Sequence, residues 1–120
     1  MNRYAFALLV GALALAPVAP RAQTTVTVYT FATVDAISLQ VGSSAVVGKL
    51  VVRGILQGEA APVDRSFTFY ASSDPSGVVL ETCARMATLA MEKPGQYAFQ
   101  VDDLPGYTNY PRCKLSRANL

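Results

Sequence analysis

The stretch LETCARMATLAMEKPGQYAFQVDDLP, residues 80–105, decides the fold, because a helical pattern in it passes through a Pro-Gly stop into a strand pattern. In its first part, apolar residues recur at intervals of three and four, which predicts a helix with a wide apolar arc. Pro94 and Gly95 end this helix. From Tyr97 to Val101 every second residue is large and apolar, which predicts a strand with one buried face.

The helix is predicted to begin at Asp74-Pro75, because Asp is a favoured N-cap and Pro suits the first helical position. Its polar stripe consists of Glu81, Arg85, Thr88 and Glu92. Glu81 precedes Arg85 by four residues, which favours an ion pair. The apolar arc leaves two interpretations open. The domain's own sheet buries it, or it packs against copies of itself in a ring, with the polar stripe facing a wet central channel.

Upstream of the helix, the patterns at 25–31 and 36–41 predict strands that can join into one long bent strand. Further strands are predicted at 49–57 and 66–71, and a last one at 113–120. Gly54 indicates a bulge or bend. We therefore expect a mainly β fold with one long helix between strands 3 and 4, in an OB-fold barrel of about five to six strands. The alternative is another α+β roll with the same order of elements.

The chain has two cysteines, Cys83 on the predicted helix and Cys113 on the last predicted strand. In an exported domain such a pair usually forms a structural disulfide. Closing a loop of this length is expected to stabilise the domain by about 3–4 kcal/mol. Two free thiols or a redox pair are the alternatives, although the spacing is not that of a CxxC motif.

Residues 1–22 have the layout of a secretory signal peptide, with a basic start, an apolar run and small residues before the expected cut after Ala22. We expect residues 23–120 to form one OB-fold-like domain, secreted or periplasmic, with no membrane span in the mature chain. Arg3 and Arg21 lie in the leader, so eight of the ten Lys and Arg residues remain to balance eight Asp and Glu residues. A neutral mature chain gives no reason to expect a nucleic-acid partner.

The sequence carries little catalytic chemistry. It has no histidine, which excludes Ser-His and Cys-His catalysis and a histidine metal site. Asp102 and Asp103 are neighbours on a strand end, so their side chains are expected on opposite faces, as in a solvated turn rather than in an acid/base pair. We expect no enzymatic activity, no cofactor and no metal. A small hydrolase stays open as a third alternative, for which no credible base is present.

Binding is the remaining class of function, and the segment Gly106–Pro111 is the first candidate. Its residues Tyr107, Thr108, Asn109 and Tyr110 suit stacking on a sugar face and hydrogen bonding to sugar hydroxyls. The alternative is an ordinary loop whose tyrosines cover the edge of the barrel. Tyr29 and Tyr70 form a second candidate surface.

The segment Leu80 to Pro105, with its acidic VDDLP end, resembles the binding subunits of pertussis-like AB5 toxins. The similarity continues through YTNYP and the final strand, over residues 33–120. The resemblance implies an OB barrel, a homo- or hetero-pentamer around a pore lined by the helix, binding of host-surface glycans, and a catalytic A subunit as partner. It also implies that the predicted helix is the oligomer helix, through which the subunits assemble. The residues of that helix assigned to this role are Glu81, Arg85, Thr88 and Glu92.

The sequence also departs from that family. Relatives often bridge the second and third strands by a disulfide, and here both strands lack cysteine. Sialoglycan-binding relatives use a serine near the first strand and a tyrosine near the helix end. In this sequence the position of the serine corresponds to Ala32-Thr33, and Thr33 is a candidate to supply the hydroxyl group in its place. The position of the tyrosine corresponds to Met91-Glu92, so the tyrosine has no counterpart. A scaffold role, or a site moved to the tyrosine loop, becomes an alternative.

From these patterns we expect a non-enzymatic glycan-binding or scaffold subunit of a secreted AB5-type toxin that forms a pentameric ring. The candidate glycan site comprises Thr33, Tyr107, Thr108, Asn109 and Tyr110. The second hypothesis is a monomeric periplasmic binding or inhibitor module.

Overall fold

The computed structural model describes residues 25–104 and 109–118. Its elements are β1 (Thr27–Val41), β2 (Val46–Leu56), β3 (Val63–Tyr70), α1 (Val78–Glu92), β4 (Tyr97–Asp103) and β5 (Arg112–Arg117). The predicted order is confirmed, with one helix between the third and fourth strands. The predicted leader, residues 1–22, lies outside the described residues.

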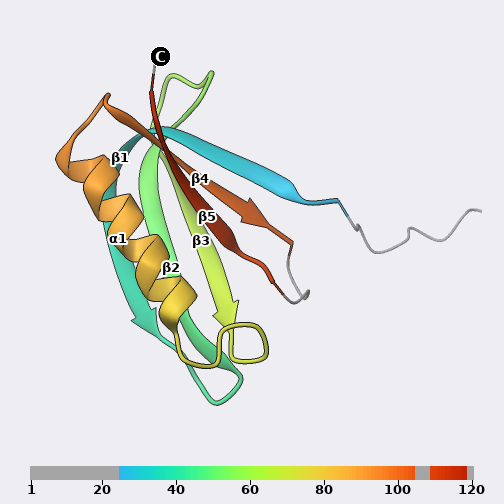
Figure 1. Cartoon of the computed structure of the whole chain (residues 1–120). Helices are drawn as coiled ribbons and strands as arrows, with labels where there is room; N and C mark the ends of the chain where they lie inside the picture. Colours follow the sequence, from blue (N-terminus) through green and yellow to red (C-terminus); the bar gives the residue numbers. More distant parts are fainter. Residues whose placement is uncertain (1–24, 105–108, 119–120) are drawn as a thin grey trace, which may run out of the picture.

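The five strands form one open antiparallel sheet in the order β3-β2-β1-β4-β5 (Figure 1). β1 is the long bent strand that the sequence predicts. Its first part, Thr27 to Phe31, pairs with β4, and its remainder pairs with β2. β1 therefore joins two halves of the sheet, and β3 and β5 form the two edges.

The bend in β1 lies opposite Gly54 of β2. The pairing register slips twice on β1 here, between Phe31 and Thr33 and between Val34 and Ala36. A Cβ atom on residue 54 would lie 2.1 Å from the backbone oxygen of Thr33, so only glycine lets the two strands approach this closely. The predicted irregularity at Gly54 is confirmed, with the extra residues on the partner strand.

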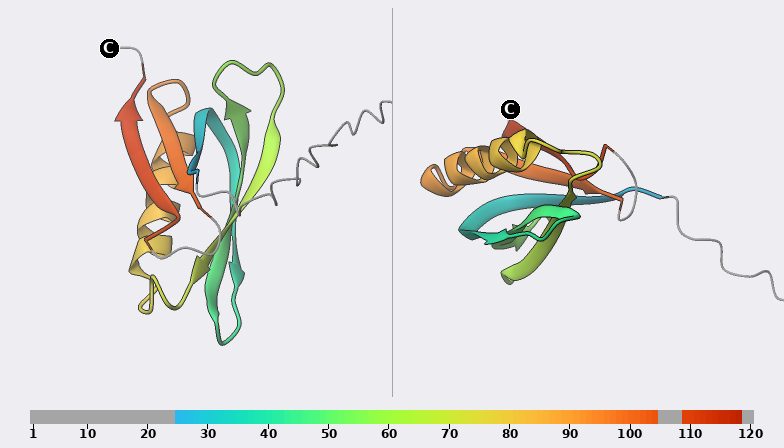
Figure 2. Two further views of the ribbon diagram at one scale, coloured as in Figure 1. Left: turned by 90° about the vertical axis from the view of Figure 1, so that its right-hand side faces the viewer. Right: turned by 90° about the horizontal axis from the view of Figure 1, so that it is seen from below.

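α1 lies over one face of the sheet (Figure 2). Its buried residues are Cys83, Ala87 and Ala90, whose small side chains let the helix approach the strands closely. Below it, four phenylalanines from three strands fill the core with almost no exposure: Phe31, Phe67, Phe69 and Phe99. Burying each aromatic ring contributes roughly 1.5–3 kcal/mol to stability. The domain's own sheet thus buries the inner part of the apolar arc.

The sheet curls around this core. The ring of Tyr29 on β1 meets the ring of Phe67 on β3 edge-on, with centroids 5.4 Å apart. The guanidinium of Arg65 lies over the same tyrosine ring, 5.9 Å from its centroid. β2 separates β1 from β3 in the sheet, so these contacts require strong curvature.

The helix begins later than predicted. Asp74 and Pro75 belong to turns, in which the backbone N–H of Asp74 donates to the carbonyl of Tyr70 and that of Gly77 donates to the carbonyl of Asp74. Gly77 has a left-handed backbone with φ 74°, which an α-helix does not admit, so α1 starts at Val78. Asp74 still caps the helix, because its carboxylate accepts hydrogen bonds from the N–H groups of Val79 and Leu80.

The predicted disulfide is confirmed. Cys83 and Cys113 are bonded, with their Cα atoms 5.5 Å apart, and the bond ties α1 to the edge strand β5. The cysteines lie 30 residues apart in the chain. The bond therefore encloses most of α1 and all of β4, and it fixes the helix against the C-terminal side of the sheet.

Candidate functional site

A cavity of about 340 Å³ lies where the end of β3, the start of α1 and the start of β5 meet. Each of these elements contributes side chains to its lining. β3 brings the buried ring of Phe69, α1 brings Val79, and the approach to β5 brings Asn109, Tyr110 and Arg112. The cavity therefore combines an apolar wall with an amide, a phenol and a guanidinium.

Tyr110 and Arg112 form one unit in this cavity. An Nη2 atom of Arg112 donates a 2.8 Å hydrogen bond to the Tyr110 hydroxyl, and the guanidinium carbon lies 4.5 Å from the ring centroid of Tyr110. The arginine thereby holds the aromatic ring in place through a polar contact and a cation–π contact. Four of the five N–H donors of the guanidinium are left for water or a ligand.

The opposite wall comes from the loop between β3 and α1. Ser73 and Asp74 line it. Asp74 is the buried polar residue of the described chain, with 4% of its surface exposed, and both of its carboxylate oxygens are used by the helix N–H groups. The hydroxyl of Ser73 donates to the Tyr70 carbonyl at 3.3 Å. This wall is therefore fixed by the Asp74 bonds that cap α1 and by the Ser73 bond in the turn after β3.

The structure brings together two of the five predicted glycan-site residues, Asn109 and Tyr110. Tyr107 and Thr108 lie outside the described residues. Thr33 does not line this cavity, and its Oγ1 atom is buried without a hydrogen-bond partner among the described residues. The glycan roles of Thr33, Tyr107 and Thr108 stay predictions.

Sequence reasoning missed Arg112 and Ser73 as members of the site. One signal for Arg112 was present, because residues 110 and 112 share a face of an extended chain and an arginine can stack on such a tyrosine. No comparable signal exists for Ser73, whose position depends on the turns before α1.

The predicted oligomer helix forms a second surface. Glu81, Arg85, Thr88 and Glu92 line a shallow depression of about 390 Å³ on the outer face of α1, together with Ala84 and Leu89. Arg85 and Glu81 form the predicted ion pair at 3.1 Å. The Thr88 hydroxyl donates to the carbonyl of Ala84, so it is satisfied within the helix.

A neighbouring depression of about 240 Å³ shares Ala84 and Thr88 with the first and extends to Ile37 and Leu39 of β1. Leu39 is 56% exposed. The outer face of α1 therefore continues into an apolar strip on the second half of β1. The role of this surface in a ring stays a prediction.

The two adjacent aspartates at the end of β4 contact different residues, as expected for neighbours on a strand. Asp102 accepts a 2.9 Å hydrogen bond from Gln100. Asp103 lines a separate small cavity beside β3. Burial raises the pKa of Asp103 above its ordinary value, while a hydrogen bond from the backbone N–H of Leu104 acts in the opposite direction.

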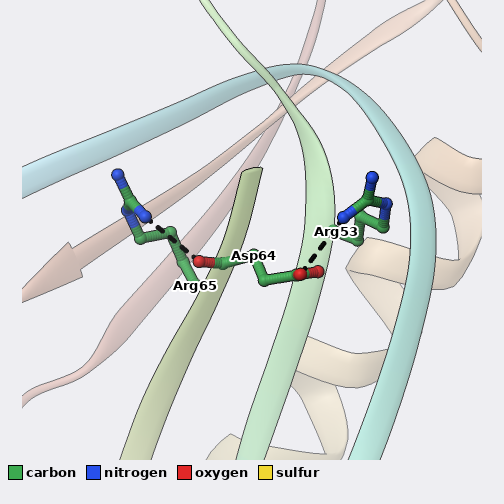
Figure 3. Close-up of polar contacts among 3 residues, drawn as sticks. All are labelled: Arg53, Asp64 and Arg65. Carbon is green, nitrogen blue, oxygen red and sulfur yellow. Dashed lines mark hydrogen bonds and ion pairs between the residues drawn. The ribbon is translucent and has the colours of Figure 1, made fainter. Parts of the chain in front are cut away.

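A third polar group lies on β2 and β3 and is structural in character. Arg53 and Asp64 form an ion pair at 3.1 Å, and Arg65 donates to the backbone oxygen of Asp64 (Figure 3). About half or more of each side chain in the ion pair is exposed. Such an exposed pair contributes about 0–1 kcal/mol to stability.

Within residues 25–104 and 109–118, no cluster of three or more His, Cys, Asp or Glu side chains is arranged to hold a metal ion. No helix in the same part of the chain has the length and apolar character needed to cross a membrane. No protein-family model matches the chain, and comparison with curated proteins and with solved structures finds no match either.

Proposed function

We propose that this protein is a non-enzymatic, exported subunit of an AB5-type toxin that binds a cell-surface glycan in the cavity beside Tyr110. In this proposal the subunits form a pentameric ring through α1, and the ring carries a catalytic A subunit. The observation that carries the proposal is the cavity itself, with its arginine-braced tyrosine ring.

The chemistry of the cavity suits a sugar. A sugar presents an apolar ring face and a rim of hydroxyl groups, and the cavity presents the Tyr110 ring, the apolar side chains of Phe69 and Val79, and hydrogen-bonding groups on Asn109 and Arg112. Its volume of about 340 Å³ lies within the range of small-ligand sites. The tyrosine ring is already held by Arg112, so little side-chain entropy is lost on binding.

The outer face of α1 supports the proposal of a pentameric ring. Ala84 and Thr88 leave a depression where a second helix can approach closely, and Leu89 supplies apolar area beside it. Glu81, Arg85 and Glu92 are exposed, which suits a surface that faces water in a channel.

We also propose that the curled sheet is an OB-type barrel. The Tyr29–Phe67 contact and the helix between β3 and β4 support this assignment. Closure would bring together the two edge strands, β3 and β5. The disulfide supports the exported location, because structural disulfides persist in oxidising compartments.

A monomeric periplasmic binding or inhibitor module is the second candidate. One observation favours it: a disulfide within the chain ties α1 to β5, which helps a domain of this size keep its fold without a partner subunit.

The binding proposal is tested on a glycan array with Tyr110→Ala and Arg112→Ala. Each is expected to lower glycan binding at least about tenfold, because a lost aromatic or charge-assisted contact at the centre of a site costs about 1.4 kcal/mol or more. Lys114→Ala is the matched control, since Lys114 is an exposed cation on the same strand and does not line the cavity. Glycan signal that both site variants retain at unchanged melting temperature would remove this site.

A further inference from the structure

A small polar cavity of about 120 Å³ lies between the edge strand β3 and the end of β4, apart from the cavity beside Tyr110. Four residues line it: Ser66, Thr68, Tyr70 and Asp103. The three β3 residues alternate along the strand, so their side chains lie on one face. They form a row of three hydroxyl groups facing one carboxyl group.

The carboxyl group of Asp103 has no charged partner in the described part of the chain. Neither of the two ion pairs there involves it, and no side chain described there donates a hydrogen bond to it. Asp103 is half-buried, and taking part of a carboxylate out of water costs free energy unless a cation or hydrogen-bond donors replace that water. The backbone N–H of Leu104 supplies one such donor. Its raised pKa has this desolvation as its main cause.

The size and lining of the cavity select the kind of group that fits. With about 120 Å³ against about 340 Å³ for the cavity beside Tyr110, it suits a small polar group such as an ammonium head with part of its stem. An ammonium carries three N–H donors, and every lining residue offers an oxygen acceptor. The Tyr70 ring adds a surface that attracts cations.

We propose that the Ser66–Thr68–Tyr70–Asp103 cavity binds a primary ammonium group, supplied by a lysine side chain of a polypeptide or by a free alkylamine. Asp103 supplies the charge, and the hydroxyl groups and the phenol accept the remaining hydrogen bonds. This site is independent of the glycan proposal, because the two cavities share no lining residue.

The test uses ¹⁵N-labelled, disulfide-bonded protein, produced by export to a bacterial periplasm. It is titrated with Nα-acetyl-lysine-methylamide, with n-butylamine, and with the Nε-acetylated form of the first probe. We expect saturable amide shifts centred on Ser66, Thr68, Tyr70 and Asp103 with both ammonium probes, and none with the acetylated probe. Similar dissociation constants for the two amines assign recognition to the ammonium alone. Tighter binding of the lysine probe assigns it to a polypeptide.

Asp103→Asn keeps the shape of the side chain and removes the charge, so it is expected to weaken binding at least tenfold. Asp102→Asn is the matched control, because this neighbouring carboxylate faces Gln100 and does not line the cavity. Unchanged binding in Asp103→Asn would overturn the proposal, as would the same loss in both variants or equal binding of the acetylated probe. Amide spectra of both variants, compared before titration, show that the fold is retained.

Discussion

The carboxylate of Asp74 accepts a 3.0 Å hydrogen bond from the backbone N–H of Leu80, although Asp74 lies outside α1. A second bond, from the N–H of Val79, is 3.1 Å long. The residue thus satisfies two of the N–H groups that every helix start leaves without a partner. Because Asp74 also lines the cavity beside Tyr110, the start of the helix and the shape of the candidate binding site depend on one side chain.

Replacing Asp74 by Ala is therefore expected to lower the free energy of unfolding by about 2 kcal/mol, the upper part of the range for helix caps, since the carboxylate is buried. Urea unfolding monitored by circular dichroism measures it. Glu59→Ala, at an exposed loop position, serves as control and is expected to change stability by less than about 0.5 kcal/mol. Equal unfolding midpoints for the two variants would show that the cap contributes nothing.

Removing the disulfide with the double variant Cys83→Ala/Cys113→Ala is expected to cost about 3–4 kcal/mol, because the unfolded chain regains the freedom of a 30-residue loop. Denaturant unfolding of this variant and of reduced wild type measures the effect twice. Both should lose a similar amount. A stability equal to that of the oxidised protein would contradict the structural role of the bond.

Asp103 is expected to make stability depend on pH. Its pKa is raised in the folded state, so the folded protein binds this proton more tightly than the unfolded chain does. The stabilising contribution is complete below the ordinary pKa near 3.8 and is lost as the pH rises through the raised pKa. Tyr70 is the other titratable group that lines the cavity.

Asp103→Asn removes this pH-dependent contribution to stability. The stability of the variant relative to wild type is therefore expected to increase from pH 3 to pH 7. Unfolding free energies of both proteins across that range test the sign. Asp102→Asn, measured alongside, controls for the loss of one negative charge on β4. The difference in unfolding free energy is taken as Asp103→Asn minus wild type. A difference that stays constant or decreases as the pH rises would contradict the burial of Asp103.

Gly54→Ala is expected to destabilise the domain by about 3 kcal/mol, because the new methyl group meets the backbone oxygen of Thr33 at the bend of β1. Gly58→Ala is the comparison, since nothing lies within 4 Å of its Cβ position. Its left-handed backbone alone costs about 1 kcal/mol. Thermal unfolding that ranks Gly58→Ala as equal or worse would contradict the close strand contact.

The parts of the fold governed by local pattern could be predicted from the sequence. Alternation predicts the strands, Gly54 predicts the irregularity, and the wheel position of Cys83 places it where β5 can reach it. The start of α1 could not be predicted, because Asp-Pro fits a turn as well as a helix start, and the turn is fixed by contacts with Tyr70. Arg112 is recognised as part of the site by its hydrogen bond with Tyr110. That contact depends on the path of the chain between the two residues, which the sequence pattern does not specify.

The ring is the central claim, and native mass spectrometry of the disulfide-bonded protein at micromolar concentration tests it most directly. We expect a five-chain species with one intact disulfide per chain. Ala84→Arg places a bulky charge in the depression on α1 and is expected to convert the assembly to monomers without unfolding them. A wild-type spectrum that contains only monomer would contradict the ring and leave the single-chain binding module as the better description.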